Sequence, residues 1–515
     1  MKQSSDKISN LPIAIIAVAS HLYGFIIFGA VFWIDSKAYI SLGYALGLEN
    51  GLREFYTGVG IWFYSHIQPG VALIWLALEN LPKSMHWPVL AVFQHAVGAG
   101  ALFYFFSTIN DYWPSRWNYV GCLVIAFLPF YQAAHNSLMT ESLSSSLILM
   151  GLSLAMRIRR DISPDYRKLL LLAFILLLLA QFRSYFGLLL FGASLIALYR
   201  FLISNFRLSC ILVLTLAISL LVFPAYRYLK TGLFWLPTLG MNKLKTGWGV
   251  NPLPTEEALK KLESFDFPDK LAPLARVNKG LSYSETADVA LHWRATGLTD
   301  FEINRRALAA GTILANDTLW VSINRGFLAL TSSGMLLPYC ALSDEMIVSP
   351  GYSAKEMCAH MRWAYDFHSW LSVVDHRPIF EKFFGHEKAT ESFALPFDYI
   401  SSQSMYEDTE TYLAERKIWQ RDPLGLGRIN PDWFIISALL AMVLTSRDRK
   451  FFASMCAWVM IGNASVNFLA AVGNPRYGYF LFPLYSAFAF LGVAQFDCWL
   501  RSRRLVPTLS HRLWR

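Results

Sequence analysis

The chain has 515 residues, of which 55% are hydrophobic and only 16% are charged. A soluble domain carries roughly 25% charged residues, so the composition excludes an ordinary soluble protein of this length. The formal net charge of +9 would suggest a nucleic-acid partner only if the basic residues shared a soluble face, and they lie instead beside apolar segments.

The hydrophobic residues gather in runs along the chain, and most runs approach the roughly 17–25 residues that a helix needs to span a bilayer. Backbone groups in lipid must bond within their own segment, so these runs are predicted to be α-helices. The sequence therefore predicts an all-α polytopic membrane protein with about ten transmembrane helices. The predicted spans are residues 11–33, 87–106, 117–131, 142–156, 169–181, 184–202, 208–226, 433–445, 451–472 and 478–500.

Basic residues in short loops mark the cytoplasmic side of a membrane protein. They gather at the N-terminus, at 157–168 (RIRRDISPDYRK), at 446–450 (SRDRK) and in the tail after residue 500. The loop at 157–168 is cytoplasmic only if an even number of spans precedes it. We therefore interpret the weak apolar segment 67–81, which contains Gly70 and Glu79, as a juxtamembrane or re-entrant helix on the outer face.

This topology divides the chain into three parts. Residues 1–226 are predicted to form an N-terminal transmembrane module whose outer loops carry Asp35 and Glu141, and residues 432–515 C-terminal helices with a basic cytoplasmic tail. Residues 227–431 form an extracytoplasmic domain, in which the apolar stretch 311–337 is either a buried helix pair or a membrane-touching hairpin. Cys340 and Cys358 lie in this domain, where an oxidising compartment allows a disulfide between them.

Four charged residues are predicted to share the outer membrane boundary. Asp35 follows the first span and Glu141 lies in the next outer loop, while Arg183 and Arg476 interrupt two apolar hairpins. Ionisable residues at this depth are often functional, and arginine suits bidentate recognition of phosphate. The structural alternatives are a helix cap for the carboxylates and a snorkelling boundary residue for each arginine.

Several soluble-enzyme motifs are absent from the sequence. It contains no GxxxxGK[ST], HExxH, GxSxG or DxD pattern, so ATP-driven transport, zinc peptidase chemistry and manganese-dependent nucleotide-sugar transfer lose support. His135, His368 and His376 show no metal-ligand spacing. The charges at the membrane boundary are thus the better guide to chemistry.

The order of these residues resembles the GT-C superfamily of polyprenyl-phosphate-sugar-dependent glycosyltransferases, which includes protein mannosyltransferases, the aminoarabinose transferase of lipid A and arabinofuranosyltransferases. Asp35 fits the family's acidic residue in the first outer loop. The sequence His-Ile-Gln-Pro-Gly at 66–70 resembles its His-Pro-Pro-Leu segment, with one proline instead of two. Pro129 followed by Glu141 resembles its third span and second acid, with Glu in place of the more frequent Asp, and Arg-Tyr at 476–477 followed by Pro483 resembles a late span.

The resemblance implies an inverting transfer of a sugar from a lipid phosphate to an acceptor hydroxyl at the outer face of a bacterial inner membrane. Asp35 would be the general base, and its place near the low-dielectric boundary suits that role. Glu141 would orient the acceptor or Asp35, or share a divalent cation with it; no other cofactor is implied. The donor phosphate would be bound by Arg183, Arg476, His66 and Tyr477.

Two other functions remain open at this level. A flippase or transporter of a lipid-linked glycan would need polar groups along a path through the bilayer. A glycan polymerase or ligase would differ only in the size of its donor. The sequence does not identify the sugar or the acceptor, which is a protein, a lipid or a polysaccharide.

The topology is testable by labelling with a membrane-impermeant thiol reagent in intact cells. We expect Ser282→Cys to react, because residue 282 lies in the predicted outer domain, and Ser163→Cys to stay unlabelled until the membrane is broken. Labelling at position 163 from outside would overturn the count of spans and separate Asp35 from Glu141.

Overall fold

A computed structural model of the chain describes residues 9–27, 34–49, 51–52, 55, 68–136, 138–161, 165–204, 206–231, 244, 255–268, 283–317, 347–349, 352–353, 432–443, 449–470 and 481–502. Within these residues nearly all regular structure is helical. The exception is a short antiparallel pair, β1 (Ile347–Ser349) and β2 (Tyr352–Ser353).

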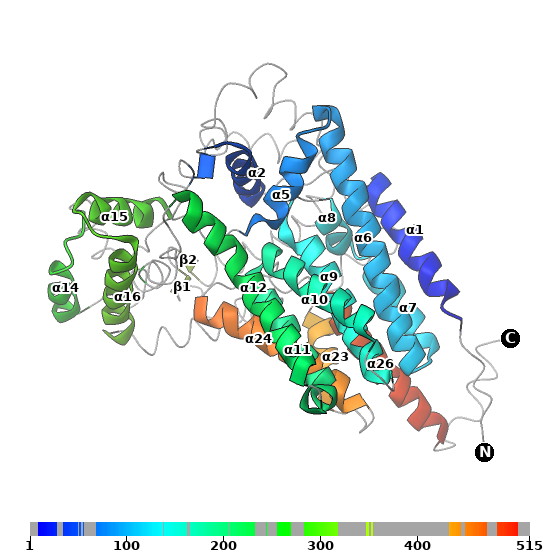
Figure 1. The fold of residues 1–515 in the computed structure, drawn as a ribbon. Coiled ribbons are helices and arrows are strands. Elements are labelled where there is room, and N and C mark those ends of the chain that lie inside the picture. Colours follow the sequence, from blue (N-terminus) through cyan, green and yellow to red (C-terminus); the bar gives the residue numbers. More distant parts are fainter. Residues whose placement is uncertain are drawn as a thin grey trace.

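Long helices form the main body of the molecule (Figure 1). The start of α1 lies beside the end of α6, because Asn10 donates to Asp111 at 2.9 Å. The end of α9 also reaches this end of the bundle, where Arg160 donates to the Asp111 carbonyl. The helices of this body are α1 (Leu11–Ile27), α6 (Lys83–Tyr112), α7 (Arg116–Ala126), α8 (Pro129–His135), α9 (Thr140–Arg160), α10 (Tyr166–Phe182), α11 (Ser184–Ser204) and α12 (Phe206–Thr231).

Two segments differ in length from an ordinary span. The prediction of one continuous helix over 117–131 is wrong, because α7 ends at Ala126 and α8 starts at Pro129. Proline has no N–H to continue a helix ladder, which explains the break. The segment 67–81 contains α5 (Pro69–Leu78), which is about 15 Å long at 1.5 Å per residue and too short for a bilayer core of roughly 30 Å.

The outer faces of the bundle are apolar, and two helices of the described part, Pro88–Tyr112 and Cys210–Thr231, are long and apolar enough to cross a membrane. On α1 the exposed large side chains recur every three or four residues and so form one stripe. This stripe consists of Leu11, Ile15, Val18, Leu22 and Ile26, each at least 56% exposed.

The interior shows the opposite polarity. On α9, Ser142, Ser144, Ser145, Ser146 and Ser153 are all buried, and Ser146 and Ser153 donate to the carbonyls four residues earlier. Apolar groups outside and polar groups inside are the distribution that a bilayer favours. The fold is therefore that of a helical membrane protein, and the count of about ten spans remains a prediction.

The C-terminal helices are α23 (Asp432–Val443), α24 (Lys450–Ala470) and α26 (Phe482–Ser502), and they pack into the N-terminal group. A Cβ at Gly192 of α11 would overlap the indole of Trp458 on α24. Similarly, Gly121 of α7 lies against Phe490 of α26. Glycine thus permits the close approach that joins helices far apart in sequence.

Three shorter helices lie beside the bundle (Figure 1): α14 (Glu256–Glu263), α15 (Tyr283–Ala295) and α16 (Asp300–Asp317). Trp293 is fully buried among them and donates at 2.8 Å to the carbonyls of Phe265 and Asp266. At the start of α16, the side chain and backbone N–H of Thr299 donate to Glu302 and lower the pKa of that carboxyl below its usual range, as in a capping box.

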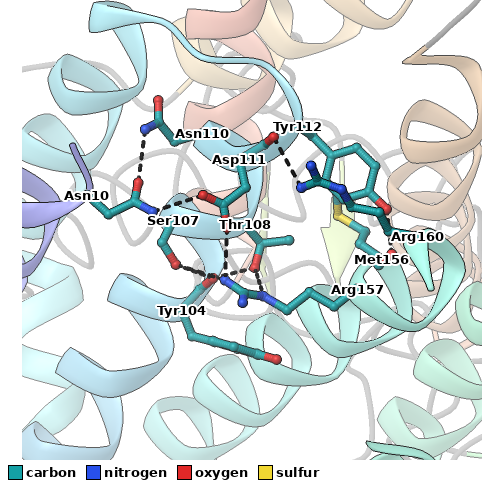
Figure 2. Close-up of polar contacts among 10 residues, drawn as sticks. All are labelled: Asn10, Tyr104, Ser107, Thr108, Asn110, Asp111, Tyr112, Met156, Arg157 and Arg160. Carbon is teal, nitrogen blue, oxygen red and sulfur yellow. Dashed lines mark hydrogen bonds and ion pairs between the residues drawn. The ribbon is translucent and has the colours of Figure 1, made fainter. Parts of the chain in front are cut away.

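A polar clamp ties α1, α6 and α9 together at the end opposite α5 (Figure 2). Arg157 of α9 donates to Thr108 at 2.8 Å and to Ser107 at 3.3 Å, and it lies 3.4 Å from the carboxylate of Asp111. Its guanidinium also lies 4.5 Å from the ring centroid of Tyr104. Only a planar guanidinium group, with its several N–H donors, can make all these contacts at once.

We therefore expect Arg157→Lys to lower the Tm of the purified protein, with a loss of about 1 kcal/mol because the pair is partly exposed. Lysine keeps the charge but cannot reach Thr108, Ser107 and Asp111 together. The matched control is Arg116→Lys, since Arg116 has a 57% exposed side chain, a 3.7 Å contact to Asp497 and a 5.7 Å distance to the Trp117 ring centroid. Equal Tm values for the two variants would show that the clamp contributes nothing beyond charge.

Candidate functional site

Two charged residues meet in a buried position where α9 begins and α10 ends. Glu141 lies in the first turn of α9, and Arg183 separates α10 from α11. The Arg183 guanidinium is 2.5 Å from Glu141 Oε1, and the two side chains are only 14% and 11% exposed. The structure thus brings together Glu141 and Arg183, which are 42 residues apart in sequence.

The rest of the Arg183 side chain is also held. Its Nε donates to Thr140 Oγ1 at 2.6 Å, another nitrogen donates to the Tyr185 hydroxyl at 3.3 Å, and Thr140 in turn donates to Glu141 Oε2 at 3.3 Å. The guanidinium also lies 5.4 Å from the ring centroid of Phe186. Each of the three guanidinium nitrogens of Arg183 thus has a hydrogen-bond partner, and these bonds hold Arg183 against Glu141.

Helix α5 starts beside this pair. Pro69 stands in its first turn, where the missing N–H is not needed. A Cβ at Gly70 would lie 2.8 Å from both the Gln181 carbonyl oxygen and the Phe182 ring. Only glycine allows this approach without a shift, so the start of α5 contacts the two residues that precede Arg183.

Helix α2 (Ile34–Gly47) continues the arrangement by packing on α5. Gly43 meets the Ala72 carbonyl and Gly47 meets Leu76, so the two helices run in the same direction and begin at the same end. Asp35 is the second residue of α2. Its helix therefore begins at the end of α5 that faces Arg183.

The C-terminal part of α2 is tied to the end of α5 and to α6 by polar contacts around Glu79. Tyr44 donates to Glu79 Oε1 at 3.0 Å, and His86 lies 3.8 Å from the same oxygen. Burial, and then the Glu79 carboxylate, raise the pKa of Tyr44 above its usual value. The hydroxyl therefore remains a donor and keeps α2 in register with α5.

Several predicted residues lie outside the described part of the chain: His66, Arg476, Tyr477, Cys340 and Cys358. The side chain of Asp35 is outside it as well, although its backbone belongs to α2. The phosphate-binding roles, the general base and the disulfide therefore stay predictions. Of the six predicted catalytic and phosphate-binding residues, Glu141 and Arg183 are those with described side chains.

A divalent cation shared by Asp35 and Glu141 does not fit the described donor set well. Both oxygens of Glu141 have partners, Arg183 and Thr140, and a cation would have to compete with the guanidinium for the same carboxylate. No group of three His, Cys, Asp or Glu side chains within the described ranges is arranged to hold a metal ion.

Sequence reasoning missed the residues that position the pair. Gly70 stands out in the sequence only as part of the weak segment 67–81 and of the motif at 66–70, and the pattern of charges and apolar runs does not mark Thr140 or Tyr185 as partners of Arg183. The short spacing of Arg183 and Tyr185 on either side of a helix break is the one local signal that could have found part of this set.

Comparison with known proteins gives little further guidance. No protein family matches the chain, and no curated protein matches it. A solved structure of the archaeal oligosaccharyltransferase AglB from Archaeoglobus fulgidus, in complex with an inhibitory peptide and a dolichol-phosphate, is similar over 98% of this chain with a TM-score of 0.36 and 11% sequence identity. This chain spans 52% of that protein. At this TM-score the likeness carries no argument, and the interpretation rests on the residues themselves.

The energetic coupling of the buried pair is testable by a double-mutant cycle. Glu141→Gln or Arg183→Gln alone leaves an uncompensated buried charge and should lower the unfolding free energy by about 3–5 kcal/mol. The double variant should be clearly less destabilised than the sum of the two. Tm values in detergent would measure this, and simple additivity would show that the two side chains do not interact.

Proposed function

We propose that this protein is a GT-C-type membrane glycosyltransferase, which moves a sugar from a polyprenyl-phosphate carrier to an acceptor hydroxyl at the outer face of a bacterial inner membrane. The proposal covers a module of residues 1–226, an extracytoplasmic domain of residues 227–431 and C-terminal helices in residues 432–515. About ten spans would hold the site at the membrane boundary.

The observation that carries the proposal is the buried Glu141–Arg183 pair with α5 beside it. A buried ion pair is weak evidence for stability, because desolvation offsets much of the attraction. In a bilayer, ionisable residues are rare and commonly mark functional sites. Here the pair lies beside the start of α5, which follows the motif at 66–70, and α2, which carries Asp35, packs on α5.

In the proposed reaction, Asp35 accepts the proton of the acceptor hydroxyl as its oxygen attacks the anomeric carbon of the donor. The bond between that carbon and the phosphate oxygen breaks, the configuration inverts, and the polyprenyl phosphate leaves with the electron pair. Glu141 orients the acceptor or Asp35. Arg183 holds the Glu141 side chain in one rotamer, because its guanidinium donates both to Glu141 and to the neighbouring Thr140.

Charge on the leaving phosphate needs a cation that stays protonated when partly desolvated. Because Arg183 is engaged with Glu141, we assign the larger share of this role to Arg476 and smaller shares to Tyr477 and His66. Stabilising the developing charge is commonly the largest catalytic contribution in such sites. The extracytoplasmic domain would cap the site and select the acceptor.

The proposal predicts that Asp35→Asn lowers the rate of transfer on the order of 10²–10⁴-fold, the range for loss of a general base, while expression and donor binding stay near normal. The measurement is mass spectrometry of products formed by the purified enzyme from a panel of polyprenyl-phosphate sugars. Glu49→Gln is the matched control, because Glu49 is an exposed acid beyond the other end of α2.

Each rival function gives a different result in this assay. A flippase would move the labelled lipid across a vesicle membrane without breaking the sugar–phosphate bond. A ligase would use only donors with long glycans. Normal turnover by a folded Asp35→Asn protein would remove Asp35 as the base, and absence of products from every donor would remove the proposed activity.

A further inference from the structure

Three histidines from three helices meet inside the bundle, apart from the site described above. His21 of α1, His95 of α6 and His135 of α8 are each no more than 4% exposed. Their ring centroids are 4.7 Å apart for His21 and His135, 5.3 Å for His21 and His95, and 5.6 Å for His95 and His135. Nothing in the proposed reaction uses them.

The hydrogen bonds of the cluster fix where the lone pairs lie. His135 Nδ1 is 2.8 Å from the Tyr131 carbonyl oxygen, which can only accept, so Nδ1 carries the hydrogen and Nε2 is a bare acceptor. His21 Nδ1 and His95 Nδ1 are 3.1 Å apart. For two neutral rings one of these nitrogens donates, and the donating ring is then left with a bare Nε2.

Five buried atoms of this cluster have no hydrogen-bond partner among the residues that the structure describes: Nε2 of His21, His95 and His135, the Tyr131 hydroxyl and Gln132 Oε1. Gln132 is fixed by its amide nitrogen, which donates to the Ala126 carbonyl. A Cβ at Gly24 would overlap Gln132 Oε1 and lie 3.0 Å from His95 Cε1. The free oxygen therefore faces the histidines.

The unpartnered atoms include more hydrogen-bond acceptors than donors. Two bare imidazole nitrogens and one amide oxygen can only accept, whereas one imidazole N–H and the tyrosine hydroxyl can donate. Buried polar groups in native proteins nearly always have partners, and those without a protein partner commonly bind internal water. The shortage here is of donors, so the missing partner must donate.

Two glycines let the unpartnered groups of the cluster pack directly against helix backbones. A Cβ at Gly98 of α6 would overlap His135 Nε2 and lie 2.5 Å from His21 Cε1, while one at Gly24 of α1 would overlap Gln132. The two positions without side chains therefore border the unpartnered atoms. The three rings also lack the arrangement of a metal site within the described residues.

We propose that the cluster of His21, His95, His135, Tyr131 and Gln132 is a binding site for a neutral hydrogen-bond donor, either water or the hydroxyl of a small alcohol. The donor bonds to the bare imidazole nitrogens and to Gln132 Oε1, and its oxygen accepts from the Tyr131 hydroxyl; Gln132 Oε1 and His135 Nε2 lie against the backbones of Gly24 and Gly98. This site is independent of the glycosyl-transfer proposal and does not require that activity.

Solid-state NMR of the ¹⁵N-histidine-labelled protein in lipid vesicles tests the proposal directly. We expect rapid magnetisation transfer from water protons to buried imidazole nitrogens, or transfer from glycerol protons when glycerol is the probe. The first result identifies water as the occupant and the second an alcohol. The absence of transfer from both would overturn the site.

Two glycine variants make the assignment specific. Gly98→Ala places a methyl group among the unpartnered atoms and should abolish the transfer. Gly100→Ala is the matched control, because a Cβ there meets nothing within 4 Å on the same helix. Transfer that survives in Gly98→Ala would place the occupant elsewhere and would also overturn the proposal.

A stability comparison gives a second, independent readout. Tyr131→Phe removes only the hydroxyl, and the Tm should fall if that hydroxyl bonds an occupant. Tyr112→Phe is the comparison, and its Tm should also fall, because it loses a hydrogen bond of 2.5 Å to the Met156 carbonyl. A dry, unpartnered hydroxyl would be removed without loss. An unchanged or raised Tm for Tyr131→Phe, with a fall for Tyr112→Phe, would therefore contradict the proposal.

Discussion

The interior of a lipid bilayer offers no water to polar groups, and this constraint shapes the whole bundle. A polar side chain that leaves water must find its partner within the protein, since an unsatisfied group there is expensive. Ser146 and Ser153 of α9 meet this demand by donating back to their own helix. Glu141 and Arg183 meet it by pairing with each other. Apolar side chains face outward along α1, where nothing polar is required.

The two ends of the bundle use charge differently. At one end, Arg157 and Asp111 belong to a partly exposed network that links α1, α6 and α9, as Figure 2 shows. At the other end, Glu141 and Arg183 are more deeply buried, with side chains 11% and 14% exposed. Exposed pairs contribute little and tolerate change, whereas a buried pair is intolerant of losing one member. This asymmetry is why we place the chemistry at the second end.

Glycines permit the close packing of helices near Glu141 and Arg183. Gly70 lets α5 touch the last residues of α10, and Gly43 lets α2 approach the backbone of α5. A side chain at either position would push the helices apart by a few tenths of an ångström or more. Such contacts matter for a site whose reacting groups come from separate helices, because small displacements weaken catalysis strongly.

The sequence by itself determined the class of the protein and much of its helix content. Apolar runs predict helices because backbone groups in lipid must bond locally, and the segment 67–81, interpreted as a juxtamembrane or re-entrant helix, contains the 10-residue helix α5. Charge patterns also suggested that Glu141 and Arg183 lie on one face. Only the tertiary structure decided that they touch, that Thr140 and Tyr185 hold Arg183, and that three isolated histidines form one cluster. These contacts join residues from different helices, and the local periodicity of a sequence carries no record of which side chains meet across helix interfaces.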